Sequence, residues 1–334
     1  MREISAQSQS EQAAPRGMVI AAFFAVYVIW GSTYLGIRFV VETVPPFLMG
    51  GARFLLAGLI LYGWLRLRGA AAPSGFHWRN AAVVGVLLLG IGNGGVNWAA
   101  QKTPSGLTAL LIAVTPLWFA LLEWVRPGGT RPQLQTVIGI VVGFCGMALL
   151  VSARDGTHRT AIDPAGVIAL MLASFAWASG SLYARYTPKP ESPFLAVALQ
   201  MIVGGIVLFL VGLAVGEWNS LDCSKISRRS TVAFIYLMVV GSFVGFTAYS
   251  WLLKVSTPSR VSTYAYVNPV IAVFLGWALG GETLTSQMLW AAAVIVLGVV
   301  IITTRREQRE EATANKADSP DTRQVGRSTL IEKT

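Results

Sequence analysis

Three side chains on one face of the first apolar stretch offer both aromatic surface and hydrogen-bonding groups. Tyr27, Trp30 and Tyr34 are spaced by three and four residues, so they share one face of a helix. Their rings combine an apolar body with a polar tip, which suits the binding of a small organic molecule. Trp30 also lies about 18 Å into the stretch, deeper than interfacial aromatic residues lie. The pattern predicts a ligand site, although ordinary helix packing would use the same residues.

The same pattern is repeated in the middle of the chain. The sequence "VIWGSTYLGIR" of residues 28–38 is closely matched by "FAWASGSLYAR" of residues 175–185, about 147 positions later. The second copy places Trp177 and Ser181 where the first places Trp and Tyr. We therefore expect Trp177 and Ser181 to face the same ligand site from the other half of the chain.

A polar stripe runs along the third apolar stretch. Asn93, Asn97 and Gln101 are spaced by four residues and so lie on one helical face. Amide groups facing lipid are unfavourable, so the stripe is expected to face a cavity or another helix. Both the lining of a ligand cavity and plain interhelical hydrogen bonding fit this pattern.

Two prolines inside apolar stretches have polar residues just before them. Thr115 precedes Pro116, and Tyr264 and Asn268 precede Pro269. A proline removes a backbone donor and opens a kink, which frees carbonyl groups that a cavity can use, although kinks also form without any ligand. The predicted substrate-binding residues are Tyr27, Trp30, Tyr34, Asn93, Asn97, Trp98, Thr115, Trp177, Ser181, Tyr264 and Asn268.

One cation falls inside an apolar stretch. Arg53 could bind a ligand carboxylate, or it could bond a helix carbonyl or a lipid headgroup, and we favour this second, structural role. Glu123 and Glu282 lie at the ends of stretches, so no carboxylate is placed at mid-membrane. This argues against a mechanism in which one buried glutamate exchanges a proton for a cation, as in small multidrug exporters.

Catalytic and metal chemistry find little support in the sequence. Cys145 and Cys223 are poorly placed for a disulfide or a metal pair, and His77 and His158 fall in separate loops. The chain has no Gly-x-x-x-x-Gly-Lys-Ser/Thr phosphate loop, which disfavours an ATP-driven pump. We expect no cofactor, no metal site and no enzymatic activity.

The elements that must position these side chains are membrane helices. Of the 334 residues, 54% are hydrophobic and only 13% are charged, too few to coat a soluble globule. Continuous apolar runs of about 20 residues fit helices that cross roughly 30 Å of hydrocarbon. We predict an all-α membrane protein with ten transmembrane helices, at 18–38, 46–66, 79–100, 103–124, 134–152, 163–184, 193–215, 231–253, 258–280 and 286–304.

Basic residues near the ends of the helices predict the orientation. If the N-terminus is cytoplasmic, the inner segments hold most of the basic residues, and the loop between 215 and 231 is the main exception. We therefore predict a multi-pass protein of the plasma membrane (the bacterial inner membrane) with both termini in the cytoplasm. The net charge of +10 then reflects topology, and without a folded basic domain it does not indicate nucleic-acid binding.

The repeat defines the domain organisation. "KTPSGLTALLIAVTPLW" at 102–118 matches "STPSRVSTYAYVNPVIA" at 256–272, so each copy extends over five predicted helices. An odd number of spans makes the two copies enter the membrane from opposite sides, the inverted symmetry used for alternating access. The expected units are a cytoplasmic segment 1–17, a first repeat 18–152, a second repeat 163–304 and a disordered cytoplasmic tail 305–334.

These motifs resemble those of the EamA-type permeases of the drug/metabolite transporter superfamily, and most of all the YedA-like exporters. The resemblance rests on "WGSTYLGIR", "ARFLLAG", "TPSGLTALLIAVTP" and "TPSRVSTYAYVNPVIAVFLGWALGGETLT", and it covers nearly all of 18–304. It implies a ten-helix inverted-repeat exporter with a central cavity between the halves. The first half lacks the Gly-Glu ending seen at Gly281 and Glu282, so no role is transferred to Glu123.

The leading hypothesis is a secondary transporter that exports small organic molecules, such as amino acids, metabolites or drug-like compounds, by alternating access. Its expected partners are a small-molecule substrate and the lipid bilayer, and coupling to protons or to another ion stays open. Facilitated uptake or exchange of a metabolite is one alternative. A non-transporting membrane scaffold is the other.

Overall fold

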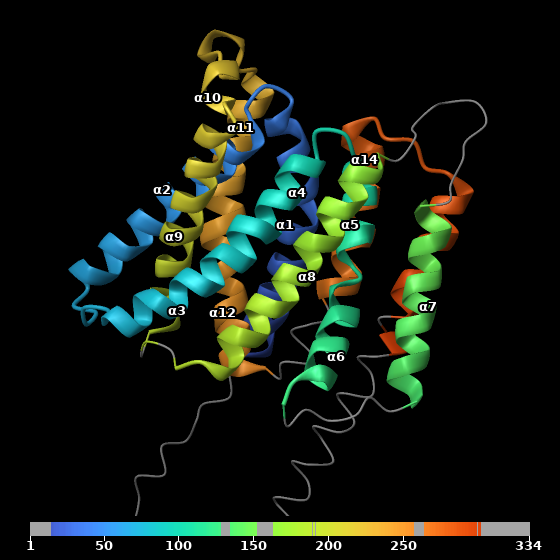
Figure 1. The fold of residues 1–334 in the computed structure, drawn as a ribbon, viewed down its shortest axis with the longest axis horizontal. Helices are drawn as coiled ribbons and strands as arrows, with labels where there is room; N and C mark the ends of the chain where they lie inside the picture. Colours follow the sequence, from blue (N-terminus) through green and yellow to red (C-terminus); the bar gives the residue numbers. More distant parts are fainter. Residues whose placement is uncertain are drawn as a thin grey trace, which may run out of the picture.

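The part of the chain that the structure describes is entirely helical. The computed structural model describes residues 15–127, 134–151, 163–188, 190, 192–256, 264–298 and 300–301, and these contain helices but no strand. Seven helical stretches are long and apolar enough to span a membrane, and shorter apolar helices cover 134–149, 267–280 and 286–298. Most helices run side by side in a bundle (Figure 1). The predicted tail and nearly all of the predicted N-terminal segment lie outside the described residues.

Prolines and free backbone amides determine where the first helix ends and where the second begins. α1 (Arg16–Val41) is separated from α2 (Pro46–Leu67) by a short turn and a Pro-Pro pair, because proline can start a helix but not continue one. The first amides of α2 have no partner within the helix. The Glu217 carboxylate accepts hydrogen bonds from those of Phe47 and Leu48, at 3.2 and 2.8 Å.

α2 packs along its length against its repeat counterpart, α9 (Pro193–Ala214), and both helices begin with Pro-Phe-Leu. The two backbones come into direct contact at glycines. A Cβ atom on Gly51 would lie 2.7 Å from the amide nitrogen of Phe209, and one on Gly205 would lie 2.5 Å from that of Leu55. Glycine is therefore required at these positions, as in other close helix contacts in membranes.

The third and eighth predicted spans each have a π-helical segment in the middle. In each segment a side chain also bonds back to a carbonyl five residues earlier: the Asn93 amide group donates to Leu88 at 3.3 Å, and the Ser242 hydroxyl donates to Leu237 at 3.2 Å. The segments occupy the same place in both copies, and π-helical turns often mark functional positions. The elements are α3 (Gly75–Gly85), η1 (Val86–Asn93) and α4 (Gly94–Ala99) in the first copy, and α11 (Arg228–Tyr236), η3 (Leu237–Val244) and α12 (Gly245–Val255) in the second.

The fourth span is interrupted next to its proline. α5 (Ser105–Ile112) and α6 (Thr115–Val125) are separated by a short turn, and Pro116 lies in the first turn of α6. The Thr115 hydroxyl donates to the Ile112 carbonyl at 2.6 Å. The break therefore forms as predicted, but this carbonyl is bonded locally rather than left free for a cavity.

The second proline has a different effect. Pro269 lies inside α14 (Tyr264–Gly280), which continues through it. The repeated Thr-Pro-Ser at 257–259 lies outside the described residues.

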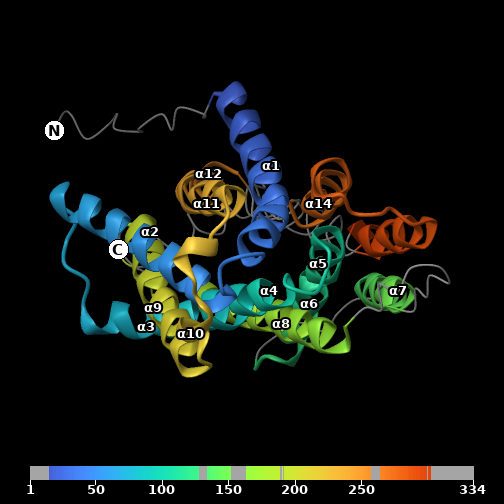
Figure 2. The ribbon, with the colours of Figure 1, turned by 90° about the horizontal axis from the view of Figure 1, so that it is seen from above.

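Two helices stand at one edge of the bundle. α7 (Leu134–Val151) packs against the helix Ser286–Gly298, and a Cβ atom on Gly298 would lie 2.7 Å from the amide nitrogen of Gly143. Figure 2 shows this pair beyond α14 and α6. They stand apart from α1, the helix that carries the first aromatic face.

α1 lies between elements of the second half. Seen from above, it is flanked by α12 and by α14, and the layer behind it contains α4 and α8 (Pro164–Tyr186) (Figure 2). One core cluster joins α1, α5, α8 and η3 through side chains that are buried almost completely, among them Val40, Leu110, Leu170 and Leu237. The two copies therefore share a core.

A compact loop joins α9 to α11 through α10 (Glu217–Ser220) and η2 (Cys223–Lys225). Gly216 starts it with φ of 82°, a left-handed conformation that favours glycine. Hydrogen bonds from the Ser224 hydroxyl, from Lys225 and from the Ser224 amide hold the pKa of Asp222 below its usual value. Cys223 in this loop and Cys145 on α7 are both free and exposed.

Candidate substrate site

The Trp30 ring lies in a cluster of aromatic side chains from three helices. Its ring centre is 5.5 Å from that of Phe246, 4.9 Å from that of Tyr249 and 5.1 Å from that of Tyr264. α1 supplies Trp30, α12 supplies the next two and α14 supplies Tyr264. We call these four residues the Trp30 cluster. Trp30 meets Phe246 and Tyr264 edge to face and Tyr249 at a tilt, and these contacts orient the rings and form an aromatic wall.

The repeat counterpart of Trp30 also reaches this cluster. The side chains of Trp177, on α8, and of Tyr34 lie near that of Tyr264, close enough for electrostatic interaction. A Cβ atom on Gly92, in the π segment η1, would lie 3.3 Å from the Trp177 ring. Tyr264 therefore packs against Trp30 and lies near its counterpart Trp177.

Asn268 ties α14 to α1 on the same side of the cluster. With its amide in the hydrogen-bonding orientation, its nitrogen donates to the carbonyls of Tyr264 and Tyr27, both at 3.2 Å. The residue is buried, and the bond to Tyr27 crosses between the halves of the chain. The structure thus brings together six of the predicted site residues: Tyr27, Trp30, Tyr34, Trp177, Tyr264 and Asn268.

The amide stripe of the third span bonds to the protein backbone. Asn97 is fully buried and donates to the carbonyl of Pro46 on α2 at 3.5 Å. Asn93 bonds within its own π segment, and the exposed Gln101 donates to the Trp98 carbonyl at 3.2 Å. For Asn97, the observed contact is a hydrogen bond between helices, which is one of the two interpretations that the sequence allowed.

The remaining predicted residues lie on other contacts. Trp98 packs against the shared core cluster, with the Lys102 ammonium 5.8 Å from its ring. Thr115 is bonded to Ile112, as described above, and Ser181 is half-buried on α8 one turn after Trp177. Substrate binding by these residues stays a prediction.

Sequence reasoning missed two members of the Trp30 cluster, Phe246 and Tyr249. Both lie just beyond the π segment η3, next to Gly245. A Cβ atom on Gly245 would lie 2.6 Å from the Trp30 indole nitrogen. The spacing of Gly241 and Gly245 indicated close helix packing, but it did not indicate which ring packs there.

An ion pair and two hydrogen bonds from backbone amides join the halves at one end of the bundle. The Arg38 guanidinium lies 3.3 Å from the Glu282 carboxylate. The same carboxylate accepts from the amides of Ser105 and Gly106, at the start of α5, at 2.6 and 3.1 Å. Anions at a helix N-terminus are favoured by its free amides and dipole. The ends of α1 and α14 and the start of α5 are thereby fastened together.

A different contact joins the halves at the opposite end. The Tyr186 hydroxyl, at the end of α8, donates to Glu123 on α6 at 2.8 Å. Arg126 lies 3.5 Å from the same carboxylate, and its guanidinium stacks 3.8 Å from the Tyr186 ring centre. Glu123, to which no role could be transferred from the family, therefore lies in a junction between α6 and α8.

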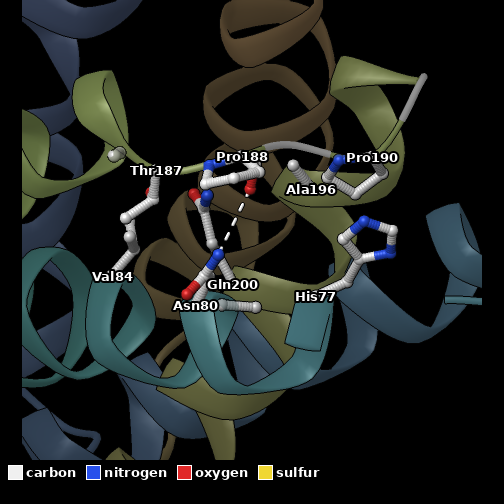
Figure 3. A pocket seen from close by; sticks show the side chains of 10 residues that line it. His77, Asn80, Val84, Thr187, Pro188, Pro190, Ala196 and Gln200 are labelled. Carbon is white, nitrogen blue, oxygen red and sulfur yellow. Dashed lines mark hydrogen bonds between the residues drawn. The ribbon is translucent and has the colours of Figure 1, made fainter. Parts of the chain in front are cut away.

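A small pocket lies near this second end, where α3 meets the end of α8 and the start of α9. Figure 3 shows the Asn80 amide pointing at the Pro188 carbonyl, to which it donates at 3.2 Å. Gln200 lines the same pocket, whose volume of about 30 Å³ suits water rather than an organic substrate. Near the first end, Ser230 of α11 donates to the Phe39 carbonyl of α1 at 2.7 Å.

Two parts of the chain match one family of known proteins. A family profile described as the EamA-like transporter family matches residues 17–152 and, a second time, residues 164–304. The chain belongs to the EamA-like transporter family. It is 38% identical over 275 residues to the Escherichia coli protein described as the uncharacterized inner membrane transporter YedA, covering 82% of this chain and 86% of that one.

More distant relatives carry related descriptions. Protein PecM of Dickeya dadantii is 27% identical over 80% of this chain and 86% of its own length. A probable amino-acid metabolite efflux pump of Salmonella typhimurium is 26% identical over 81% of this chain and 89% of its own. A solved crystal structure, 19% identical, superposes with a TM-score of 0.59 over 89% of this chain and all of that one, which supports the fold alone. The chain is a multi-pass membrane transporter, and its relatives are transporters rather than enzymes.

Proposed function

We propose that this transporter exports small organic molecules across the bacterial inner membrane by alternating access. One observation carries the proposal: Trp30, whose ring packs against that of Tyr264, and Trp177, which occupies the same place in the other copy, both lie at this tyrosine. A site shared by two related halves is where such transporters bind substrate. An aromatic wall with hydroxyl and indole groups suits a small organic molecule with an apolar part.

The proposed architecture is ten transmembrane helices in two inverted repeats, 18–152 and 163–304. Three observations support it. The family profile matches twice, a π segment interrupts the same span in each copy, and α2 packs against its counterpart α9. Five spans in each copy would place the copies upside down relative to each other, which gives two related states open to opposite sides.

The junctions at the two ends of the bundle are the proposed gates. Arg38 and Glu282 close one end across the halves, and Tyr186 and Glu123 close the other. In an alternating-access cycle one junction opens while the other stays closed. Polar and ionic contacts suit this role, because each is worth only about 0.5–3 kcal/mol and can be exchanged for water.

The pairing of basic side chains supports an orientation with both termini in the cytoplasm. At the predicted outer end, four basic residues have acidic partners: Arg38, Lys102, Lys225 and Arg229. Arg229, for example, lies 3.9 Å from Glu42. Two of the three basic residues of the loop that disagreed with the positive-inside rule, Lys225 and Arg229, thus have acidic partners. Apart from Arg228 in this loop and Arg53 inside the membrane, the described basic residues without an ion pair, such as Arg66, Arg68 and Arg79, lie at the predicted inner end.

Reconstitution into proteoliposomes tests the proposal. We expect flux of at least one compound from a panel of amino acids and cationic dyes, assayed with and without a pH gradient so that proton coupling is measured too. Trp30→Ala should lower that flux at least tenfold, and Trp290→Ala, a tryptophan that is 70% exposed, should leave it unchanged. Folded protein without flux of any compound would refute export, and equal effects of the two substitutions would refute the site.

A further inference from the structure

Arg53 on α2 is a buried cation with an unsatisfied donor. Only 3% of the residue is exposed, and it lies about 10 Å from the start of the helix. Its Nε atom donates to the Ser242 hydroxyl at 3.2 Å, and its guanidinium carbon lies 4.7 Å from the ring centre of Phe54. Nη1 has no hydrogen-bond partner. A guanidinium in this setting normally has a carboxylate or several carbonyls around it.

No carboxylate of the described residues is left for Arg53. Glu217 caps α2, and the others are paired with cations that are not Arg53. These pairs are Arg38 with Glu282, Lys102 with Asp163, Arg126 with Glu123, Lys225 with Asp222, and Arg229 with Glu42. Arg53 is therefore charged, buried and not neutralised by this part of the protein.

The Arg53 head group lies beside the Trp30 cluster. A Cβ atom on Gly241 would lie 3.2 Å from Arg53 Nη2 and 3.3 Å from Thr33 on α1. One helical turn further, at Gly245, the corresponding atom would lie 2.6 Å from the Trp30 indole nitrogen. The guanidinium and the aromatic wall thus follow each other along one seam, between α1 and the η3–α12 stretch.

Helix packing alone does not require this charge. The repeat places Gln200 of α9 at the position of Arg53, seven residues after the shared Pro-Phe-Leu start. Gln200 also borders the matching span, since its carbonyl would lie 2.7 Å from a Cβ atom on Gly85 of α3. A neutral side chain therefore serves the same packing position in the other half.

We propose that Arg53 binds a carboxylate of the transported substrate, while the Trp30 cluster contacts the apolar or aromatic part of the same molecule. This inference rests on the proposed transport function and names its substrate class. A guanidinium offers parallel N–H donors that match the two oxygens of a carboxylate, and the free Nη1 supplies one of them. Ser242, on the π segment, orients the guanidinium from the other side.

A route to the seam lies next to it. A groove of about 730 Å³ runs between α1, α11 and α14, and Ser32 and Tyr236 are among its lining residues. These two are hydrogen-bonded to each other at 2.5 Å, and Tyr236 is close enough to Arg53 for an electrostatic interaction. Separation of α1 from the end of α11 and from η3 would break this bond and join the groove to Arg53.

Ligand binding to the purified full chain tests the inference without requiring transport. The probes are 3-phenylpropanoate, which carries a carboxylate, and 2-phenylethylamine, its cationic counterpart, and binding is measured by thermal stabilisation and by equilibrium dialysis. Wild type should bind 3-phenylpropanoate at least tenfold more tightly than the amine. Arg53→Gln should abolish this preference, and Arg53→Lys should retain part of it. Arg66→Gln, the same change at the far end of α2, should have no effect.

Each possible result either supports or overturns the assignment of Arg53 as a carboxylate-binding residue. Failure of wild type to bind 3-phenylpropanoate, or an equal preference in Arg53→Gln and wild type, overturns the assignment. A purely structural role would lower the melting temperature of Arg53→Gln and leave its preference between the probes intact. Preference for the carboxylate without flux in proteoliposomes would reject transport and keep the site, whereas flux unaffected by Arg53→Gln would keep transport and reject the site.

Discussion

The Arg38 guanidinium meets the Glu282 carboxylate across the two halves of the chain, at 3.3 Å. The carboxylate is almost fully buried and also holds the first amides of α5. One side chain therefore fixes three helix ends, and its loss should free all of them. At the opposite end of the bundle, the junction made by Tyr186 and Glu123, which also joins the two halves, gives a matched comparison.

Glu282→Gln should open the first junction. The amide keeps one acceptor for the α5 amides but loses the charge that holds Arg38, at a cost of about 1–3 kcal/mol. In a background without the native cysteines, Ala109→Cys on α5, which is 1% exposed, should react several-fold faster with a membrane-impermeant maleimide added to whole cells. Glu42→Gln, which removes the longer Arg229 pair, serves as control, and equal rates in the two variants would contradict a gate at Glu282.

Tyr186→Phe should weaken the second junction and expose buried positions from the cytoplasmic side rather than from the outside. It removes the hydroxyl that donates to Glu123 but keeps the ring against Arg126. A cysteine at Ala178, a buried position two turns earlier on α8, should become more reactive in inside-out vesicles and not in whole cells. Faster labelling from the outer side would exclude an inner gate at this junction.

Gly245→Ala should displace Trp30. The added methyl group would lie 2.6 Å from the indole nitrogen, closer than atoms pack, so the ring must move out of the cluster. We expect flux to fall at least tenfold with little loss of folded protein. Gly90→Ala, whose new methyl group would lie 3.3 Å from a Val207 methyl group and so needs only a small adjustment, should retain most of the flux. Flux assays and gel filtration of the two variants check this difference.

Asn97→Ala should affect stability more than transport. The side chain is fully buried, bonds to Pro46 and lies against Gly50 of α2. Removing it leaves a small cavity and takes away the hydrogen bond to α2, worth about 1–2 kcal/mol, so the melting temperature should fall while the apparent substrate affinity is retained. A change in substrate preference at unaltered stability would instead place Asn97 in the binding site.

Much of the fold could be predicted because it depends on composition and periodicity. Apolar runs, prolines and the repeat predicted helices at nearly the observed limits, including the start of α2 at Pro46 and the break before Pro116. The convergence of Trp30 and Trp177 could be expected as well, since equal positions in two copies tend to share an environment. These are local or repeated signals.

Contacts between residues that lie far apart in the sequence could not be predicted in the same way. Arg53 was expected to be structural because helix α2 alone does not show that Ser242 faces it or that the carboxylates are engaged elsewhere. The π segments also escaped prediction, since a single surplus residue in a turn leaves the hydrophobic pattern almost unchanged. Glycines spaced by four residues, such as Gly90 and Gly94 or Gly241 and Gly245, indicate close helix packing but not a π segment.

The wide turns at η1 and η3 also set the rotational phase of everything that follows them. Each takes up one residue more than an α-helical turn, so the helix that follows keeps its orientation despite the extra residue. Phe246 and Tyr249 follow η3 directly. In an uninterrupted helix the same extra residue would turn both rings by about 100° away from the seam, so the aromatic wall depends on where the backbone takes up that residue as much as on the side chains themselves.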